Sequence, residues 1–366
     1  MAPFAILGIG SDTSLWFSDL RSRHRVSDDL TAALDQLQSE SAHYPVTFAL
    51  SYDATAARFL GGAEALPSGR ASALDACVWG RVETLSKADV LARLPQDDAP
   101  IDWSLDQDYD YWQAAFDRVQ AYLRAGDCYQ VNLTVRGQGG FSGTSAALHR
   151  RLLSHQWVPF HALMPWGEGW AVSQSPELLW SVEHDRIACE PMKGTVANDR
   201  LADKADALAA WLAKDPKNRA ENVMIVDLIR NDLGRIAVTG SVEVPVAFEV
   251  RRYQTVQQMV SRVAATLDDP ALASWVNALV PFGSITGAPK KRAIEVIQEL
   301  EPGPRGVYTG SLGYLYKGKS LANVAIRTLD HEQGRFTFGV GGGITVGSDV
   351  AEEWDEVQLK TRFLNA

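Results

Sequence analysis

The sequence predicts an α+β fold with largely antiparallel sheets. Strand-like segments occur in neighbouring groups between groups of helix-like segments, instead of alternating one by one as in a parallel α/β fold. No GxGxxG motif follows a strand, which argues against a dinucleotide-binding domain. The chain has 366 residues, of which 46% are hydrophobic and 22% charged, so we expect either two lobes or one large sandwich.

The first hundred residues contain few recognisable motifs. Residues 1–16 are apolar but lack a basic segment, so we interpret them as a first strand rather than a signal peptide. A polar stretch at 95–108 predicts a soft boundary, either a linker or a surface excursion. We therefore expect a divergent N-terminal region at 1–100 and a second region at 109–366.

The pattern becomes clearer from residue 109 onward. Apolar residues at helical spacing predict a helix that ends at Gly126, and Pro289 suits the first turn of a later helix. Further helices are predicted at 143–156, 199–213, 218–233, 270–280, 288–300 and 351–364. Strands are predicted at 128–135, 160–166, 170–183, 186–194, 241–256, 310–316, 319–330 and 335–346.

Charge and cysteine content narrow the class of protein. The formal net charge of −10 argues against nucleic acid or an anionic membrane surface as the main partner. The three cysteines are far apart and form no CxxC pair, which favours a reducing compartment without a disulfide framework. No apolar run approaches 18 residues, so we expect no membrane span and a cytoplasmic location.

Two glycine-rich stretches could bind a ligand through their backbone. "GSITGAPKKR" at 283–292 leads into a helix N-terminus, which suits an anion, although a tight turn with a helix cap is the simpler interpretation. "GVGGGITVGSD" at 339–349 places several glycines in a strand. Either a bulge or a backbone that faces a ligand would account for them.

Several charged residues have both a structural and a chemical interpretation. Glu221 near a helix start, and Glu353 with Glu356 on one helix face, could be helix-dipole and i,i+4 partners or could bind Mg²⁺. Glu177 could be a surface glutamate or an acid–base group beside apolar residues. Lys193, in "CEPMKGT", could be a solvated charge or a nucleophile in a dry pocket.

Taken together, these stretches resemble the chorismate-utilising enzymes, a family that includes anthranilate, aminodeoxychorismate, isochorismate and salicylate synthases. The resemblance runs in order from about residue 109 to 366. It is carried by "AGDCYQVNLT", "SPELLW", "EPMKGT", "RAENVMIVDLIRNDLGR", "GSITGAPKKRAIEVIQELEP", "RGVYTGSLGYL", "NVAIRTL" and "GGGITVGS" with "EEWDEVQLK". The family fold implies two large antiparallel sheets packed as a sandwich with surrounding helices, to which residues 1–100 would contribute strands.

The resemblance also implies roles for individual residues. Gln130 together with Lys193 is similar to the members that aminate chorismate at C4, through a covalent adduct of Lys193. Glu177 is implied as general acid and base, and Mg²⁺ as cofactor on Glu221, Glu353 and Glu356. Substrate-binding roles are implied for Gln130, Thr195, Ser284, Tyr308, Arg327, Gly341, Gly343 and Lys360.

Ammonia as co-substrate implies a separate glutamine amidotransferase subunit, because no such segment occurs in this chain. Two alternatives remain at this stage: another enzyme of the family, such as an anthranilate or isochorismate synthase, or a catalytically weakened chorismate-binding subunit. The second alternative is motivated by Gln257 and Gln258, where the family usually has a histidine, by Asn218, where an acid is usual, and by residues 346–348, which are "VGS" where the family usually has "ADS".

Overall fold

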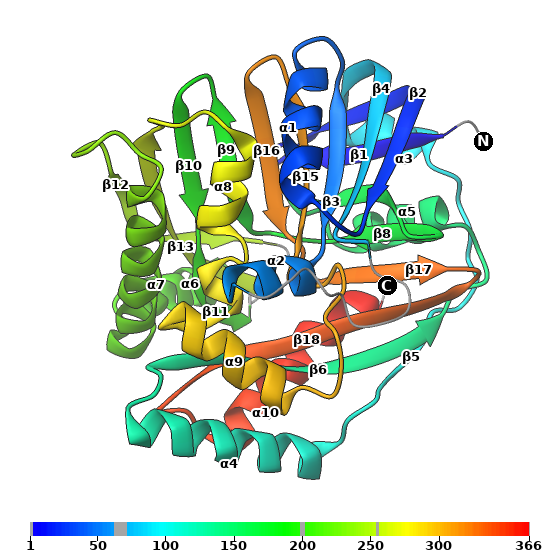
Figure 1. Ribbon diagram of the computed structural model, residues 1–366. Coiled ribbons are helices and arrows are strands. Elements are labelled where there is room, and N and C mark those ends of the chain that lie inside the picture. The colour runs from blue at the N-terminus through cyan, green and yellow to red at the C-terminus, as the bar shows by residue number, and fades with distance from the viewer. Residues whose placement is uncertain (1–2, 62–71, 198–201, 254–255, 366) are drawn as a thin grey trace.

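The computed structural model describes residues 3–61, 72–197, 202–253 and 256–365 (Figure 1). The strands are β1 (Phe4–Gly8), β2 (Thr13–Val26), β3 (Val46–Leu50), β4 (Leu74–Ser86), β5 (Asp102–Leu105), β6 (Gln130–Gly140), β7 (Ala162–Trp166), β8 (Gly169–Ser173), β9 (Leu178–Glu183), β10 (Arg186–Glu190), β11 (Met192–Ala197), β12 (Glu243–Arg252), β13 (Val256–Thr266), β14 (Gly287–Ala288), β15 (Ser311–Tyr316), β16 (Lys319–Val324), β17 (Thr328–Glu332) and β18 (Arg335–Thr345). The helices are α1 (Leu30–Ser41), α2 (Tyr52–Phe59), α3 (Lys87–Arg93), α4 (Tyr109–Ala125), α5 (Ser145–His155), α6 (Ala202–Leu212), α7 (Pro216–Gly234), α8 (Leu272–Leu279), α9 (Lys290–Leu300) and α10 (Val350–Thr361).

Antiparallel pairing joins these strands into one continuous network. Its order is β5–β6–β18–β17–β8–β7–β1–β2–β4–β3–β15–β16–β9–β10–β13, with β14 added to β6, and β11 and β12 added to β13. The predicted α+β class with antiparallel sheets is confirmed. The first hundred residues take part directly, because β1 pairs with β7 and β3 pairs with β15.

The network is folded into two layers (Figure 1), with strands β3, β9, β10, β15 and β16 above β6, β17 and β18 in that view. Side-chain alternation along β1 shows the layering, since successive strand residues point to opposite faces. Ala5 and Leu7 lie in the core between the layers, whereas Phe4 and Ile6 lie in a core covered by α3, α4, α5, α9 and α10. A third core lies beneath α1, α2, α7 and α8. The sandwich with surrounding helices is therefore confirmed.

Some local expectations were wrong. The predicted strand at 170–183 is divided into β8 and β9, and the one at 186–194 into β10 and β11. Pro289 is the N-cap of α9 rather than a residue of its first turn. Helices α1, α2 and α3 were not predicted. The first residues of the helix predicted at 199–213 lie outside the described residues, and the remainder corresponds to α6.

Two helix starts place acidic side chains near one another. Asp215 caps α7 by accepting from the Asn218 N–H, and Asp349 caps α10 by accepting from the Ala351 and Glu352 N–H groups. Glu221 follows in the second turn of α7, and Glu353 in the first turn of α10.

No helix in the described part of the chain is long and apolar enough to cross a membrane.

Candidate active site

A cavity of about 520 Å³ lies where β11, β18, α7, α10 and the 283–288 turn meet. Most of the predicted site residues line it, although they come from distant parts of the sequence. These are Glu177, Lys193, Glu221, Ser284, Tyr308, Arg327, Gly341, Gly343, Glu353, Glu356 and Lys360. A concave site with a few converging polar groups is the usual form of a small-molecule site.

The Lys193 side chain enters this cavity at an irregularity in β11. The register between β11 and β13 shifts between Met192 and Thr195, and Gly194 has a φ of +85°. A side chain at 194 would place its Cβ 2.7 Å from Oδ1 of Asn218, so glycine is required both by the backbone and by the space. This bulge directs the Lys193 side chain away from the β11–β13 pairing and into the cavity.

The Lys193 side chain is half-buried in the wall of the cavity. Burial lowers its pKa, while Glu221, Glu177 and Glu356 act in the opposite direction. A lysine amine that loses its proton more readily is a better nucleophile at neutral pH. This is the environment that the nucleophile interpretation of Lys193 requires.

Glu177 is buried at the start of β9, with 3% of its surface exposed. Burial raises the pKa of Glu177 to about 7, and the Ser284 hydroxyl, the Met192 N–H and Lys193 oppose this rise. The Met192 N–H donates to Oε1 of Glu177 at 3.4 Å. A carboxyl group with a pKa near 7 can both release and accept a proton at neutral pH.

Gln130 lies directly beside the Lys193 amine. A Cβ at Gly343 would be 2.6 Å from Nζ of Lys193 and 2.9 Å from Nε2 of Gln130, so both groups occupy the space that this glycine leaves. Gln130 is fully buried, and neither Oε1 nor Nε2 has a hydrogen-bond partner within the described residues. A buried amide of this kind is costly to leave unpaired, which indicates a place for a polar ligand.

The carboxylates of α10 lie around Lys360, beside Gly342 of β18. Nζ of Lys360 is 2.6 Å from Oε1 of Glu356 and donates to the Gly341 carbonyl at 2.8 Å. Oε1 of Glu353 accepts a hydrogen bond from the Ser348 hydroxyl at 2.6 Å. The expected i,i+4 pair is therefore present, and its two members also line the cavity.

The chemistry of these acids suits a divalent cation. Burial raises the pKa of both Glu221 and Glu353, and Glu356 raises each further by charge repulsion. However, no group of three or more His, Cys, Asp or Glu side chains in the described part of the chain is arranged to hold a metal ion. Mg²⁺ is commonly held by one or two carboxylates together with water and substrate oxygens, so the donor set fits this ion.

Two cavity residues suit an anionic group. The backbone of Arg327 has a φ of +49°, and burial lowers the pKa of its guanidinium. Within the described residues no hydrogen bond or ion pair of this guanidinium occurs. Burial also raises the pKa of Tyr308 to about 12, so its hydroxyl stays protonated and can donate. Both side chains are therefore ready to bind a carboxylate.

Other predicted residues are placed less directly. Ser284 lies in a short 3-10 turn ahead of β14, where its hydroxyl is near enough to Glu177 to oppose the rise in the pKa of that carboxyl. The Gly341 carbonyl is already occupied by Lys360. Thr195 pairs with Gln258 in the β11–β13 ladder, but its side chain lies outside the described part of the structure.

The sequence interpretation missed several residues that line the cavity. They are Asn132, Trp211, Asp215, Lys217 and Glu352 among others. Asn132 is two positions beyond Gln130 on β6, so strand alternation could have placed it on the same face. Asp215 could have been found as the N-cap before Pro216.

Comparison with known proteins identifies the family. Residues 20–366 match the family model described as chorismate binding enzyme. Over 245 residues the chain is 44% identical to aminodeoxychorismate synthase component 1 of Salmonella typhimurium. The aligned region covers 66% of this chain and 54% of the relative. It is 37% identical over 255 residues to anthranilate synthase component 1 of Pseudomonas putida, covering 69% and 52% respectively. The chain thus spans about half the length of these two curated relatives.

Among solved structures, the fold is similar to that of anthranilate synthase component I from Streptococcus pneumoniae. The TM-score is 0.83 with 24% sequence identity, and the match covers 98% of this chain and 93% of the other. The family match extends over nearly all of the sequence, and the cavity brings together the residues on which the resemblance was based. The chain therefore belongs to the family of chorismate binding enzymes.

Proposed function

We propose that this chain is an aminodeoxychorismate synthase, which converts chorismate and ammonia to 4-amino-4-deoxychorismate. The observation that carries the proposal is the pair formed by Lys193 and Gln130 over Gly343. The similarity to relatives named aminodeoxychorismate synthase component 1 supports the same choice among members of the family. An uncharged glutamine beside a dehydrated amine suits a lysine that attacks carbon rather than one that activates water.

The first step would form a bond between Lys193 and the ring. The neutral amine attacks C2 of chorismate, both conjugated ring double bonds shift (C1=C2 to C1=C6 and C5=C6 to C4=C5), and the C4 hydroxyl departs. Protonated Glu177 donates its proton to that hydroxyl, which leaves as water. The lysine nitrogen is then a secondary ammonium attached to C2.

The second step would restore the enzyme. Ammonia attacks C4, both double bonds shift back to C5=C6 and C1=C2, and the C2–nitrogen bond breaks with its electrons returning to Lys193 as a neutral amine. Glu177, now a carboxylate, accepts one proton from the new ammonium at C4. The net reaction consumes chorismate and ammonia and releases the aminated product and water.

The substrate carboxylates would be held by other residues that line the cavity. Arg327 and Tyr308 would bind one of them, with Ser284 and the backbone of Gly341 and Gly343 lining the same cavity. Glu221, Glu353 and Glu356 would hold Mg²⁺, which when bound neutralises a carboxylate of the substrate. Lys360 would position the glutamates through its contact with Glu356.

Ammonia would come from a separate glutamine amidotransferase subunit. The name component 1, which several relatives carry, implies a second component for those proteins. Because free ammonia is scarce at neutral pH, where ammonium dominates, a dedicated source of the neutral molecule would be needed here as well.

Incubation of the purified chain with chorismate, Mg²⁺ and an ammonium salt tests this proposal. Mass spectrometry should detect 4-amino-4-deoxychorismate with its pyruvyl ether intact. Anthranilate or isochorismate as the product would instead make this chain another enzyme of the family, an outcome that the similarity to anthranilate synthase keeps in view. Binding of chorismate without its consumption would support a chorismate-binding subunit, in line with Gln258 rather than a histidine at the cavity wall.

A further inference from the structure

Tyr308 separates the candidate active site from a second cavity. The second cavity has a volume of about 700 Å³, and its walls include Arg136, Trp166, Phe338 and the loop from Pro302 to Val307. Tyr308 lines both cavities. An aromatic ring with open space on two sides is not held by packing alone, so other contacts must keep it in place.

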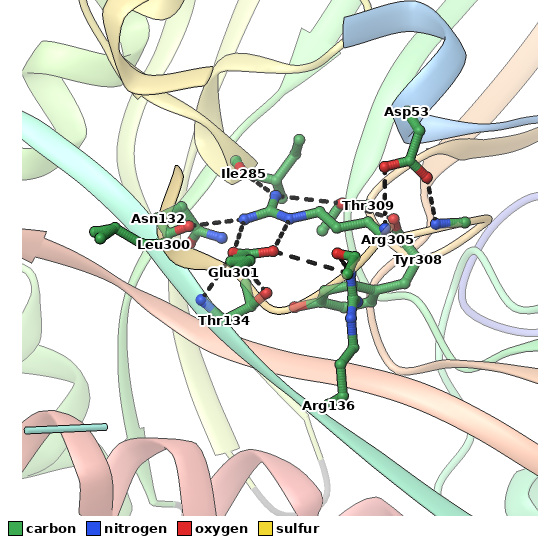
Figure 2. Close-up of polar contacts among 12 residues, drawn as sticks. Asp53, Asn132, Thr134, Arg136, Ile285, Leu300, Glu301, Arg305, Tyr308 and Thr309 are labelled. Carbon is green, nitrogen blue, oxygen red and sulfur yellow. Dashed lines mark hydrogen bonds and ion pairs between the residues drawn. The ribbon is translucent and has the colours of Figure 1, made fainter. Parts of the chain in front are cut away.

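Two close neighbours restrain the Tyr308 ring directly. A Cβ at Gly339 would lie 2.2 Å from Cδ1 of Tyr308, so the ring rests against the bare backbone of β18. The guanidinium of Arg136 lies 5.6 Å from the ring centroid, within reach of a cation–π contact. Figure 2 shows Arg136 and Tyr308 beside a larger polar cluster that includes Glu301 and Arg305.

Arg305 and Glu301 form the centre of that cluster. Nε of Arg305 donates to Oε2 of Glu301 at 2.9 Å, and its NH2 group donates to Oε1 at 2.6 Å. The two side chains are 1% and 3% exposed, so this is a fully buried bidentate ion pair. Neither residue lines the candidate active-site cavity.

The same pair binds the backbone of two segments that do line the cavity. Arg305 donates to the Ile285 carbonyl at 2.9 Å and to the Asn132 carbonyl at 2.8 Å (Figure 2). Glu301 accepts from the N–H and the hydroxyl of Thr134, at 3.1 and 2.7 Å. The pair therefore joins the turn that carries Ser284 to strand β6, which carries Gln130.

The loop that leads to Tyr308 is anchored at its start. Oδ1 and Oδ2 of Asp53, on α2, accept from the N–H groups of Arg305 and Gly306 at 3.0 and 2.7 Å (Figure 2). At the other end, the Thr309 hydroxyl donates to the Tyr308 carbonyl at 2.6 Å and lies 3.4 Å from NH1 of Arg305. The Tyr308 segment is thus held at its start by Asp53, through the backbone, and at its end by the Arg305 guanidinium, through Thr309.

We infer that Arg305 and Glu301 are positioning residues for the substrate-binding wall of this site, acting through Tyr308, the Ser284 turn and β6. The inference rests on the proposed function, because it concerns how chorismate is held. Neither residue of the pair lines the cavity that Lys193 and Glu177 line, so we expect the pair to affect the binding of the substrate more than the bond-forming steps.

Arg305→Lys separates this role from a general contribution to folding. Lysine keeps the positive charge beside Glu301, but its single ammonium lacks the planar fork that reaches Glu301, Ile285 and Asn132 together. We expect KM for chorismate to rise about tenfold, the equivalent of one lost charge-assisted hydrogen bond, while kcat changes less than about threefold.

Arg23→Lys is the matched control. Arg23 also forms a bidentate pair, with Asp75 at 2.8 and 2.6 Å, and donates to the Gly167 carbonyl at 2.7 Å, but none of these residues lines the cavity. We expect the control to leave KM and kcat unchanged even if its melting temperature falls. Calorimetry on the wild type, Arg305→Lys and Arg23→Lys would measure the dissociation constant for chorismate. We expect this constant to change in the same direction and by a similar factor as KM.

A second variant covers the case in which Arg305→Lys does not fold. Thr134→Val removes the hydroxyl that donates to Glu301 at 2.7 Å and preserves the shape of the side chain. We expect a rise in KM of about threefold with kcat retained. An unchanged KM in a folded Arg305→Lys or Thr134→Val protein would overturn the inference. So would a fall in kcat equal to the fall in kcat/KM. In either case, turnover by the wild-type protein would still support the proposed function. A wild-type protein that does not bind chorismate would overturn both.

Discussion

Nζ of Lys193 and Nε2 of Gln130 meet over the bare backbone of Gly343. The space is so limited that a Cβ at Gly343 would come within 2.6 Å of the amine and 2.9 Å of the amide. A real Cβ contact is never that close, so any side chain at this position must displace one group or both. The geometry of the proposed nucleophile therefore depends on a residue without a side chain.

Gly343→Ala tests this dependence. We expect kcat with ammonia to fall about a hundredfold, because a displacement of the order of 1 Å is enough to misalign a reacting atom. Gly347→Ala is the control, since a Cβ at Gly347 meets nothing within 4 Å. Steady-state kinetics would measure the effect, and equal activity of the two variants would contradict the placement of the amine.

Lys193→Ala should remove turnover while chorismate still binds. We expect a loss on the order of a thousandfold or more in kcat, because the variant lacks the amine that forms the covalent bond with the ring. Product formation by mass spectrometry and chorismate binding by calorimetry give the two readouts. Lys204→Ala, which changes an exposed lysine on α6, should behave as wild type. Full activity of Lys193→Ala would exclude the covalent role.

Glu177 should make the stability of the fold depend on pH. The folded protein holds this proton more tightly than the unfolded chain, because burial raises the pKa from 4.5 to about 7. Stability is therefore lost as pH rises through this interval. Glu177→Gln should be more stable than wild type by about 3 kcal/mol at pH 8 and similar to it at pH 4. Denaturant unfolding at both pH values would measure this, and a pH-independent difference would argue against the raised pKa.

Glu177 and Lys193 should also shape the pH dependence of activity. As pH rises above about 7, Glu177 loses the proton that the first step needs, so the rate should fall. As pH falls, Lys193 becomes protonated, but its lowered pKa moves this loss to more acidic conditions than for an ordinary lysine. A profile of kcat against pH that rises steadily toward pH 10 would be inconsistent with Glu177 as the acid.

The acids of α10 should control the metal requirement. Glu356→Gln is expected to raise the Mg²⁺ concentration for half-maximal activity at least about tenfold, because one charged ligand is lost. Asp355→Asn is the control, since Asp355 neighbours Glu356 in sequence but is exposed and does not line the cavity. Titration of Mg²⁺ against activity and against protein fluorescence gives two readouts. Identical titration curves for the two variants would contradict the proposed ligand.

Arg327→Met should improve stability at the expense of binding. The guanidinium of this half-buried residue has no ion pair within the described structure, and a charge partly withdrawn from water in this way costs folding free energy until an anion arrives. We expect the melting temperature to rise and the affinity for chorismate to fall at least about tenfold. A variant that binds chorismate normally would show that the carboxylate lies elsewhere.

The sequence predicted the residues that line the site better than the residues that hold them in position. Lys193, Glu177, Arg327 and Tyr308 lie within stretches that resemble a family, so their joint occurrence identified them although they are distant in the chain. The Arg305–Glu301 pair could not be found in this way, because Arg and Glu at the end of a helix are usually solvent-exposed. Its burial depends on the packing of β6, α9 and the 283–288 turn around it.

The fold class followed from the grouping of strands, but the pairing of those strands did not. Hydrophobic alternation shows that a segment is a strand and which residues share a face, whereas it does not identify the neighbouring strand. Helices α2 and α3 were missed because they are short, and all three missed helices, α1 included, lie in the region with the fewest motifs. The position of the Thr195 side chain stays a prediction.

The pairing of β3 with β15 affects how the chain can be made. Leu50 emerges from the ribosome early, but its partner Ser311 is synthesised only near the end. Until then one edge of β3 exposes unpaired backbone groups, a condition that favours aggregation. The nascent N-terminal segment is thus expected to need protection by chaperones, and a fragment that ends before β15 should accumulate in insoluble form.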